Sequence, residues 1–338
     1  MVKMITPSFA LTATERVLPR MALDFTTATL DPRVTLTRTG NTATVINSSG
    51  VIAAINADLP RFDFNPTTLI CNGLLIEEAR TNLLLNSLID GTSLSTQIVV
   101  TTAVAHTLSF YGSGQIVLTG TSSATVVGTG AYPARQTLTF TPTVGALTLT
   151  VTGIVQYAQL EVGAFVTSFI PTDGTTKTRN ADVALMTGTN FSSWYNASEG
   201  SFVVWSSIPF SSGSGVFAVI SDNTNSQRML MNLSSSRNGC SFRVVNGGVD
   251  QANIARTNPF TAGQQNKMVA TYKLNSFATA FNGQVAGTDT SGTVPTVSQI
   301  GIGNSAVGTP SVFFNGYFQK ILYYPQRLIN AEVQAFSK

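Results

Sequence analysis

Charged side chains are scarce in this chain of 338 residues, of which only 10% are Asp, Glu, Lys or Arg. An average soluble protein has roughly 25%. The net charge is +3, and no cluster of Lys and Arg is longer than a pair. Because a protein that neutralises a run of phosphates needs a basic patch or stripe, the sequence predicts no nucleic-acid partner.

Histidine and cysteine are almost missing, and His106, Cys71 and Cys240 are the whole supply. Zinc sites use three or four such ligands, so we expect no metal site of this kind and no cofactor. The two cysteines lie far apart in sequence, and we expect both to be reduced and buried. His106 lies between two β-forming runs, and the chain has no Gly-x-Ser-x-Gly motif. A serine triad needs an oriented histidine base, so a structural histidine is predicted instead.

The acidic residues are not arranged as in glycosidases, which need two carboxyl groups several ångströms apart across one cleft. Glu77 and Glu78 are adjacent, so a strand would send them to opposite faces. Glu161 and Glu199 have no near acidic neighbour. We therefore predict a protein that is not an enzyme. Asp222 opens an Asp-Asn-Thr-Asn run, which is compatible with calcium binding but is better explained as an Asx turn.

No apolar run reaches the roughly 20 residues of a membrane-spanning helix, although the mean hydropathy is +0.20. Residues 1–20 contain a single Lys and are interrupted by Pro7, which is unlike a signal peptide. We expect synthesis in a cytoplasm and no membrane insertion. The same residues show almost no periodicity, and we expect an extended arm that becomes ordered against a partner.

In place of charge the sequence has Ser, Thr, Asn and 28 Gly, the residues that coat and separate β-strands. Residues 34–46 alternate apolar and polar side chains around a Gly-Asn turn, which predicts a hairpin or meander. Between residues 97 and 160, short β-branched runs follow one another at roughly 8–12-residue spacing, as in a sandwich or jelly roll. Strand-like runs resume at residue 201, and one helix is predicted over residues 329–336.

The predicted fold class is all-β, in three parts. Residues 1–70 form an N-terminal arm and β-meander for attachment, which is too short for a core of its own. Residues 71–182 form a jelly-roll sandwich, and residues 183–338 form a second sandwich that ends in a short helix. A turn-rich cluster at residues 171–176 separates the last two parts.

Several stretches resemble virion proteins of tailed bacteriophages. Met-Ala-Leu-Asp-Phe at 21–25, Pro-Arg-Phe-Asp-Phe-Asn-Pro at 60–66 and Gly-Leu-Leu-Ile-Glu-Glu-Ala-Arg-Thr-Asn-Leu at 73–83 are similar, in this order, to the N-terminal part of head-decoration or tail-fibre proteins. Residues 159–182 are similar to the end of the carbohydrate-binding-module-like jelly roll in those proteins. Residues 315–332 resemble the closing strand and helix of laminin-G or concanavalin A-like sandwiches.

The resemblance implies a structural protein of the phage particle, made in the cytoplasm of the host bacterium and located in the virion. Its implied partners are other virion proteins and sister chains, in a homotrimer. For attachment we expect burial of apolar residues such as Leu23 and Phe25 against the particle. Glu77, Glu78 and Arg80 are the most charged local group, and we expect them either to pair within the chain or to orient a neighbouring subunit.

A host-surface glycan is the expected ligand of such a display protein. Trp194 and Tyr195 offer aromatic rings that stack on sugar rings, and Asn196 offers an amide that binds hydroxyl groups. A hydrophobic plug between the two sandwiches is the alternative and the favoured reading of these residues. Two other functions stay open for the whole protein: a cement protein that only stabilises the capsid, and a polysaccharide depolymerase.

Overall fold

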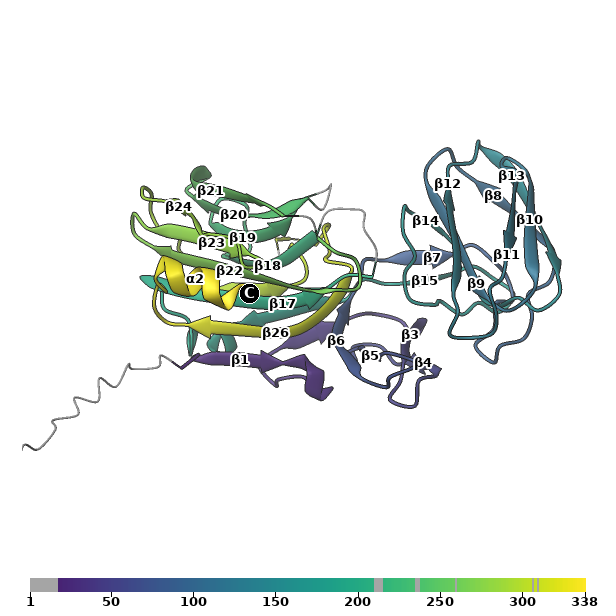
Figure 1. The fold of residues 1–338 in the computed structure, drawn as a ribbon, viewed down its shortest axis with the longest axis horizontal. Coiled ribbons are helices and arrows are strands. Elements are labelled where there is room, and N and C mark those ends of the chain that lie inside the picture. Colours follow the sequence, from purple (N-terminus) through teal and green to yellow (C-terminus); the bar gives the residue numbers. More distant parts are fainter. Residues whose placement is uncertain (1–17, 210–214, 235–237, 259, 306, 309) are drawn as a thin grey trace, which may run out of the picture.

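The structure is a computed structural model, and it describes residues 18–209, 215–234, 238–258, 260–305, 307–308 and 310–338. The described chain is built mainly of β-strands, which confirms the predicted all-β class (Figure 1). Most strands gather in two sandwiches, a large one and a small one, that lie side by side (Figure 1). Most of the predicted arm falls in residues 1–17, outside the described part. Among the described residues, no helix has the length and apolarity needed to span a bilayer.

The large sandwich stacks an eight-stranded sheet on a seven-stranded sheet. The first sheet has the order β24–β23–β22–β17–β26–β6–β5, and β1 also pairs with β26. Its strands are β1 (Met21–Asp24), β5 (Phe62–Phe64), β6 (Cys71–Ile76), β17 (Glu199–Ser207), β22 (Gln265–Lys273), β23 (Phe277–Phe281), β24 (Gly287–Asp289) and β26 (Gly316–Tyr324).

The second sheet has the order β2–β16–β25–β18–β19–β20–β21. Its strands are β2 (Thr35–Thr37), β16 (Val183–Thr187), β18 (Gly215–Ser221), β19 (Arg228–Leu233), β20 (Gly239–Asn246), β21 (Val249–Thr257) and β25 (Gln299–Ile302).

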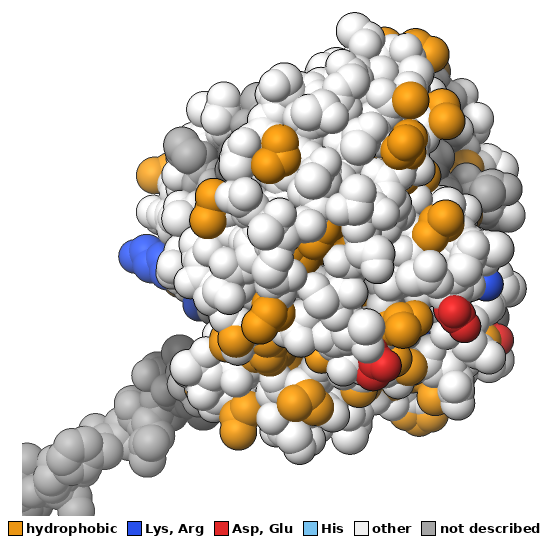
Figure 2. All heavy atoms as spheres, turned by 90° about the vertical axis from the view of Figure 1, so that its right-hand side faces the viewer, with side chains coloured by type: hydrophobic (Ala, Val, Ile, Leu, Met, Phe, Trp, Pro, Cys, Tyr) orange, Lys and Arg blue, Asp and Glu red, His pale blue; other side chains and the backbone are white. Residues whose placement is uncertain are grey.

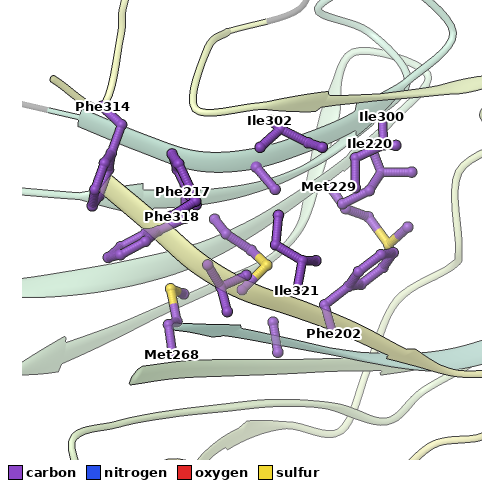
Figure 3. Close-up of a cluster of buried hydrophobic side chains, with 14 of the residues drawn as sticks. Phe202, Phe217, Ile220, Met229, Met268, Ile300, Ile302, Phe314, Phe318 and Ile321 are labelled. Carbon is purple, nitrogen blue, oxygen red and sulfur yellow. The ribbon is translucent and has the colours of Figure 1, made fainter. Parts of the chain in front are cut away.

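The core of the large sandwich follows from the period-two alternation of its strands. In β19, Met229 and Met231 are buried in the core while Leu230 between them is only partly buried. Figure 3 shows part of this core, in which phenylalanine, isoleucine and methionine side chains from both sheets interdigitate. The predicted C-terminal helix is confirmed as α2 (Asn330–Phe336). The carboxylate of Glu332 accepts the N–H of Ile329 at 3.0 Å and so satisfies a free donor at its start.

The small sandwich packs a four-stranded sheet of order β11–β10–β13–β8 against a three-stranded sheet of order β12–β9–β14. Leu108, Phe110, Ile116 and Leu118 contribute to a separate core. The sandwich predicted from the spacing of short strands is therefore confirmed. Its strands are β8 (Gln97–Thr101), β9 (His106–Tyr111), β10 (Gln115–Gly120), β11 (Ala124–Val127), β12 (Gln136–Phe140), β13 (Gly145–Thr152) and β14 (Gln156–Val162).

The small sandwich is an insertion into the large one, between β6 and β16. The chain enters it through β7 (Arg80–Asn82) and leaves through β15 (Lys177–Arg179), and these two strands pair as an antiparallel ribbon (Figure 1). A hairpin of β3 (Ala43–Ile46) and β4 (Ile52–Ile55) lies beside this junction (Figure 1). The hydroxyl of Thr44 in the hairpin donates to the carbonyl of Phe169 at 2.6 Å.

The sheets cross the domain boundaries that the sequence suggested at residues 70 and 182. Strands β1, β2 and β5 from residues 1–70, and β6 from residues 71–182, are strands of the large sandwich. The N-terminal strands join the large sandwich because β26 is long. Along one of its edges, β26 pairs first with β6 and then with β1. In the same way β2 pairs with β16 rather than with β3. An alternating pattern predicts a strand, but not the strand beside it.

Candidate functional site

The predicted glycan platform lies inside the large sandwich. Trp194 follows the single-turn helix α1 (Thr189–Ser192) and is only 1% exposed. Its indole N–H donates to the carbonyl of Asn190 at 2.7 Å, and its ring packs against Tyr323 with centroids 4.9 Å apart. Phe191 and Phe202 also pack against this ring, with centroids 5.0 and 6.3 Å away. These aromatic neighbours occupy the surface that a sugar would need, so the prediction of Trp194 as a stacking residue is wrong.

The side chains of Tyr195 and Asn196 also make their contacts within the large sandwich. The Tyr195 ring stacks on Phe191 at 4.7 Å and on Tyr272 at 5.8 Å between centroids. The Asn196 side chain donates to the carbonyl of Pro325 at 2.7 Å and accepts the N–H of Ser198 at 3.0 Å. The three residues therefore form a plug, but not in the place that the favoured prediction gave it. The plug sits within the large sandwich and not between the two sandwiches.

The predicted assembly residues of the N-terminal segment are likewise internal. Leu23 and Phe25 are almost fully buried in the core of the large sandwich. Strand β1 reaches that core because it pairs with β26, with Leu23 opposite Ile321. The prediction that Leu23 and Phe25 bury against the particle is therefore wrong, because neither side chain is available to a second protein.

A buried ionic network at the start of the small sandwich contains Glu77, one of the remaining predicted residues. Asp182 lies at its centre, accepting from Arg38 at 2.9 Å, from Arg61, and from the N–H of Glu77 at 2.9 Å. The side chains of Arg38, Arg61 and Asp182 have no solvent exposure. The network thus ties the segment before the insertion to the segment after it.

The carboxylate of Glu77 has several partners within this network. Its carboxylate accepts the N–H of Ser168 at 2.9 Å and pairs with Arg61 at 2.7 Å and Arg179 at 3.1 Å. Burial by itself would raise the pKa of Glu77, but the charges of Arg179 and Arg61 outweigh it and hold the pKa at about 2. Glu77 is therefore a fixed anion of the fold.

Glu78 and Arg80 form an ion pair of 2.6 Å at the beginning of the ribbon. The guanidinium of Arg80 also lies over the ring of Phe165, 4.6 Å from its centroid. All three charged residues of the predicted group are thus paired within the chain, as the first of the two sequence readings expects. Their use in orienting a neighbouring subunit is contradicted for Glu77, which is buried.

A cavity of about 210 Å³ lies next to this network, between the two sandwiches. For comparison, a cavity of about 150 Å³ holds benzene, so this one accommodates a single six-membered ring. We call it the inter-sandwich cavity. It is lined by the hairpin, the large sandwich and the small sandwich, through Thr44, Val45, Ile46, Ile52, Asp63, Leu75, Glu77, Tyr111, Arg135, Val166, Thr167, Ser168, Phe169, Pro209, Asn315 and Tyr317.

Asp63 is the buried carboxyl group of the cavity. Strand β5 places it where one of its oxygens accepts the N–H of Ile46 at 2.7 Å and the other accepts the hydroxyl of Tyr317 at 2.9 Å. Burial raises the pKa of Asp63 to about 6, although both hydrogen bonds act in the opposite direction. Each oxygen retains acceptor capacity beyond these bonds, so Asp63 can still accept hydroxyl groups of a ligand.

The opposite side of the cavity is aromatic and cationic. Arg135 donates to the carbonyl of Thr167 at 2.8 Å and to the hydroxyl of Ser109 at 2.9 Å, and it lies over the Tyr111 ring at 5.8 Å. Its Nε atom is buried without a hydrogen-bond partner among the described residues. Tyr111 packs against Tyr132 with centroids 5.2 Å apart, which fixes the wall in place.

No local motif marks the cavity in the sequence. Asp63, Tyr111, Arg135 and Tyr317 come from four separate segments that meet only after folding. Two weak signals exist in retrospect. Asp63 is a carboxyl residue between two phenylalanines, and Arg135 is the only Asp, Glu, Lys or Arg between residues 91 and 160.

The remaining sequence candidates are structural. His106 is buried, and its Nδ1 lies 2.8 Å from the carbonyl oxygen of Val104. Asp222 forms the predicted Asx turn by accepting the N–H and the hydroxyl of Thr224 at 2.8 and 2.6 Å. Within the described ranges, no cluster of three or more His, Cys, Asp or Glu residues could hold a metal ion.

Asp63 should make the stability of the protein pH-dependent. Its pKa rises from an ordinary 3.8 to about 6 on folding, so the native state binds more protons between these values. The stabilisation is complete below the lower pKa and is lost as the pH rises through the upper one. Relative to Asp63→Asn, the wild-type chain should lose on the order of 2 kcal/mol of unfolding free energy between about pH 4 and pH 7. Urea unfolding of both proteins across this range measures the difference, and a constant difference would contradict a raised pKa.

A known protein family matches most of the large sandwich. Residues 176–334 match the family model of the concanavalin A-like lectin/glucanases superfamily. No curated protein sequence matches the chain.

Several solved structures are similar at low identity. The CBM40 of Ruminococcus gnavus IT-sialidase bound to α2,3-sialyllactose is 13% identical with a TM-score of 0.38, over 42% of this chain and 83% of that one. The SAP-like pentraxin of Limulus polyphemus is 13% identical with a TM-score of 0.33, over 42% of this chain and 70% of its own. The topology and the family match together assign residues 176–334, completed by N-terminal strands, to a concanavalin A-like β-sandwich.

Proposed function

We propose that this chain is a non-enzymatic structural protein of a bacteriophage particle, and that its inter-sandwich cavity binds one sugar residue of a host-surface glycan. The virion role is supported by the resemblance of residues 21–83 to phage head-decoration and tail-fibre proteins. The glycan role is supported by the lectin/glucanase family match of the large sandwich. Attachment occurs through the N-terminal region, before β1.

The observation that carries the glycan role is the set of side chains around the cavity. Tyr111 and Phe169 supply aromatic surface, Asp63 supplies a desolvated carboxyl group, and Arg135 supplies a guanidinium. A sugar ring has apolar faces that pack on aromatic rings and hydroxyl groups that need both acceptors and donors. Ligand sites also form preferentially where two domains meet.

The same cavity argues against a depolymerase, although two carboxyl groups line it. Glycoside hydrolysis needs one carboxyl group as an acid and a second one as a base or nucleophile. Asp63 has a pKa of about 6, which suits an acid. Glu77, however, accepts from Arg61, Arg179 and Ser168, and these partners occupy its carboxylate. The occupied carboxylate of Glu77 supports a binding role for this cavity over hydrolysis.

A binding experiment tests the glycan role. The full chain is titrated with oligosaccharides of bacterial surface polysaccharides by calorimetry, and the reducing ends are counted afterwards. Asp63→Asn should weaken binding about ten- to hundredfold, because a hydrogen bond to a charged group contributes roughly 1.5–3 kcal/mol. The expected count of new reducing ends is that of the buffer alone, and their release would establish a depolymerase.

The control variant is Asn253→Ala, in a separate polar hollow that Asn232, Ser241 and Arg256 also line on the seven-stranded sheet. This variant should bind as the wild type does. If Asn253→Ala loses binding and Asp63→Asn keeps it, the glycan site lies on the sheet and not in the cavity. Absence of binding to any oligosaccharide would leave the capsid-cement role, in which particles without the protein resist heat poorly but adsorb normally. An antibody against the chain should label purified particles in either role.

A further inference from the structure

The outer end of the small sandwich has almost no charge. Residues 91–160 contain one residue of the Asp, Glu, Lys and Arg group, Arg135. Its guanidinium faces the inter-sandwich cavity, where it donates to Thr167 and Ser109. Figure 2 shows this end of the molecule, with hydrophobic side chains among uncharged ones over most of the face and few charged side chains. Designed soluble surfaces are roughly 25–35% charged, and neutral ones associate.

Strand β8 is an unprotected edge of this surface. It pairs with β13 alone and so lies at the end of its sheet. Ile98 is 64% exposed and Val100 is 76% exposed, both on the outward face of the strand. Neither proline nor a charged residue interrupts it. An edge of this kind is a template for another strand, because half of its backbone N–H and C=O groups point away from the sheet.

Several other edges of the described sheets are protected. Strand β21, at the end of the seven-stranded sheet, has an ion pair of 2.7 Å between Arg243 of the neighbouring strand and its own Asp250. Strand β24 carries Asp289, and β5 carries Asp63. Strand β11, the opposite edge of the small sandwich's four-stranded sheet, is flanked by β12 of the other sheet. Among these edges, β8 is the one without a charged residue or a flanking strand.

We propose that β8 pairs antiparallel with β8 of a second copy of this chain, joining two four-stranded sheets across a two-fold axis. The occupant must offer both a strand edge and an uncharged face, since β8 has no charge to complement. A second β8 meets both conditions. With Val99 on the axis, Ile98 of each copy lies opposite Val100 of the other, which forms two cross-strand pairs of β-branched side chains. The resemblance to fibre proteins suggests a trimer, whereas this edge gives a closed, two-fold contact.

The oligomeric state of the full chain tests this contact. Light scattering after size exclusion should give twice the 35.7 kDa of the chain. Val100→Lys places a charge on the exposed edge without touching the core, and it should give a folded protein with the mass of one chain. The control, Val127→Lys, changes a residue on β11 that is 55% exposed and should keep the doubled mass. A monomeric wild type, a trimer, or loss of association only in Val127→Lys would overturn the proposal.

A cross-linking experiment tests the register. Ile98→Cys and Val100→Cys are prepared separately, mixed and oxidised. Directly opposed residues of antiparallel strands have Cα atoms about 4.5–5.5 Å apart, which is within the range of a disulfide. The mixture should yield a disulfide between the two variants, and each variant alone should yield far less. Equal cross-linking of single variants and mixture would contradict the register.

Discussion

Residues 183–338 expressed alone should fail to fold, although this is the stretch that the sequence delimits as a domain and that the family match nearly covers. The fragment lacks β1 and β6, the partners of one whole edge of β26, and β2, the partner of β16. It also lacks seven side chains that are almost fully buried in the core, namely Met21, Leu23, Phe25, Val34, Leu36, Leu74 and Ile76.

The size of the effect follows from this burial. Burying one large apolar side chain contributes roughly 1.5–3 kcal/mol, so seven of them are comparable to the roughly 5–15 kcal/mol by which a whole domain is stable. Circular dichroism and the denaturation profile of the fragment measure the outcome. The matched control is residues 18–338, which keep every strand of both sheets and should unfold cooperatively. A cooperative transition in the short fragment would show that the N-terminal strands are dispensable.

Asp182→Asn should be the most destabilising single polar substitution in the chain. Asp182 is the shared partner of Arg38 and Arg61, and all three side chains are completely buried. Removing its charge leaves two guanidinium groups without their common counter-charge in the interior, which costs roughly 3–5 kcal/mol for a broken buried pair. Urea unfolding of the full chain gives the change in free energy directly.

The matched control for Asp182 is Asp250→Asn, which breaks the ion pair between Arg243 and Asp250. Both of those side chains are at least 40% exposed, and an exposed pair contributes roughly 0–1 kcal/mol. The two substitutions make the same chemical change in different surroundings. If they destabilise the protein equally, the buried network does not tie the two ends of the insertion together.

Some of the local structure could be predicted from the sequence because local physics determines it. The alternation of β19 and the short β-branched runs between residues 97 and 160 each specify a strand without knowledge of its neighbours. The Asx turn at Asp222 depends on residues at most two positions apart. These predictions hold because the interactions that decide them lie within a few residues.

The candidate site could not be predicted in this way. Trp194 and Tyr195 stand beside Asn196 in the sequence, which looks like a sugar platform, but helix α1 turns both rings into the sandwich. Conversely, the inter-sandwich cavity unites Asp63 and Tyr317, which are 254 positions apart and joined by one hydrogen bond. The residues around Asp63 and Tyr317 in the sequence do not predict that these two side chains come into contact.

By itself, therefore, the sequence determined an all-β chain with little charge, two sandwiches and a closing helix. Only the tertiary structure decided that the small sandwich is inserted into the large one, that the N-terminal strands complete the large sheets, and that a cavity lies between the two. The physical reason is that a strand's side-chain pattern is set by its own residues, whereas its hydrogen-bonding partner is chosen among all the unpaired edges of the folding chain.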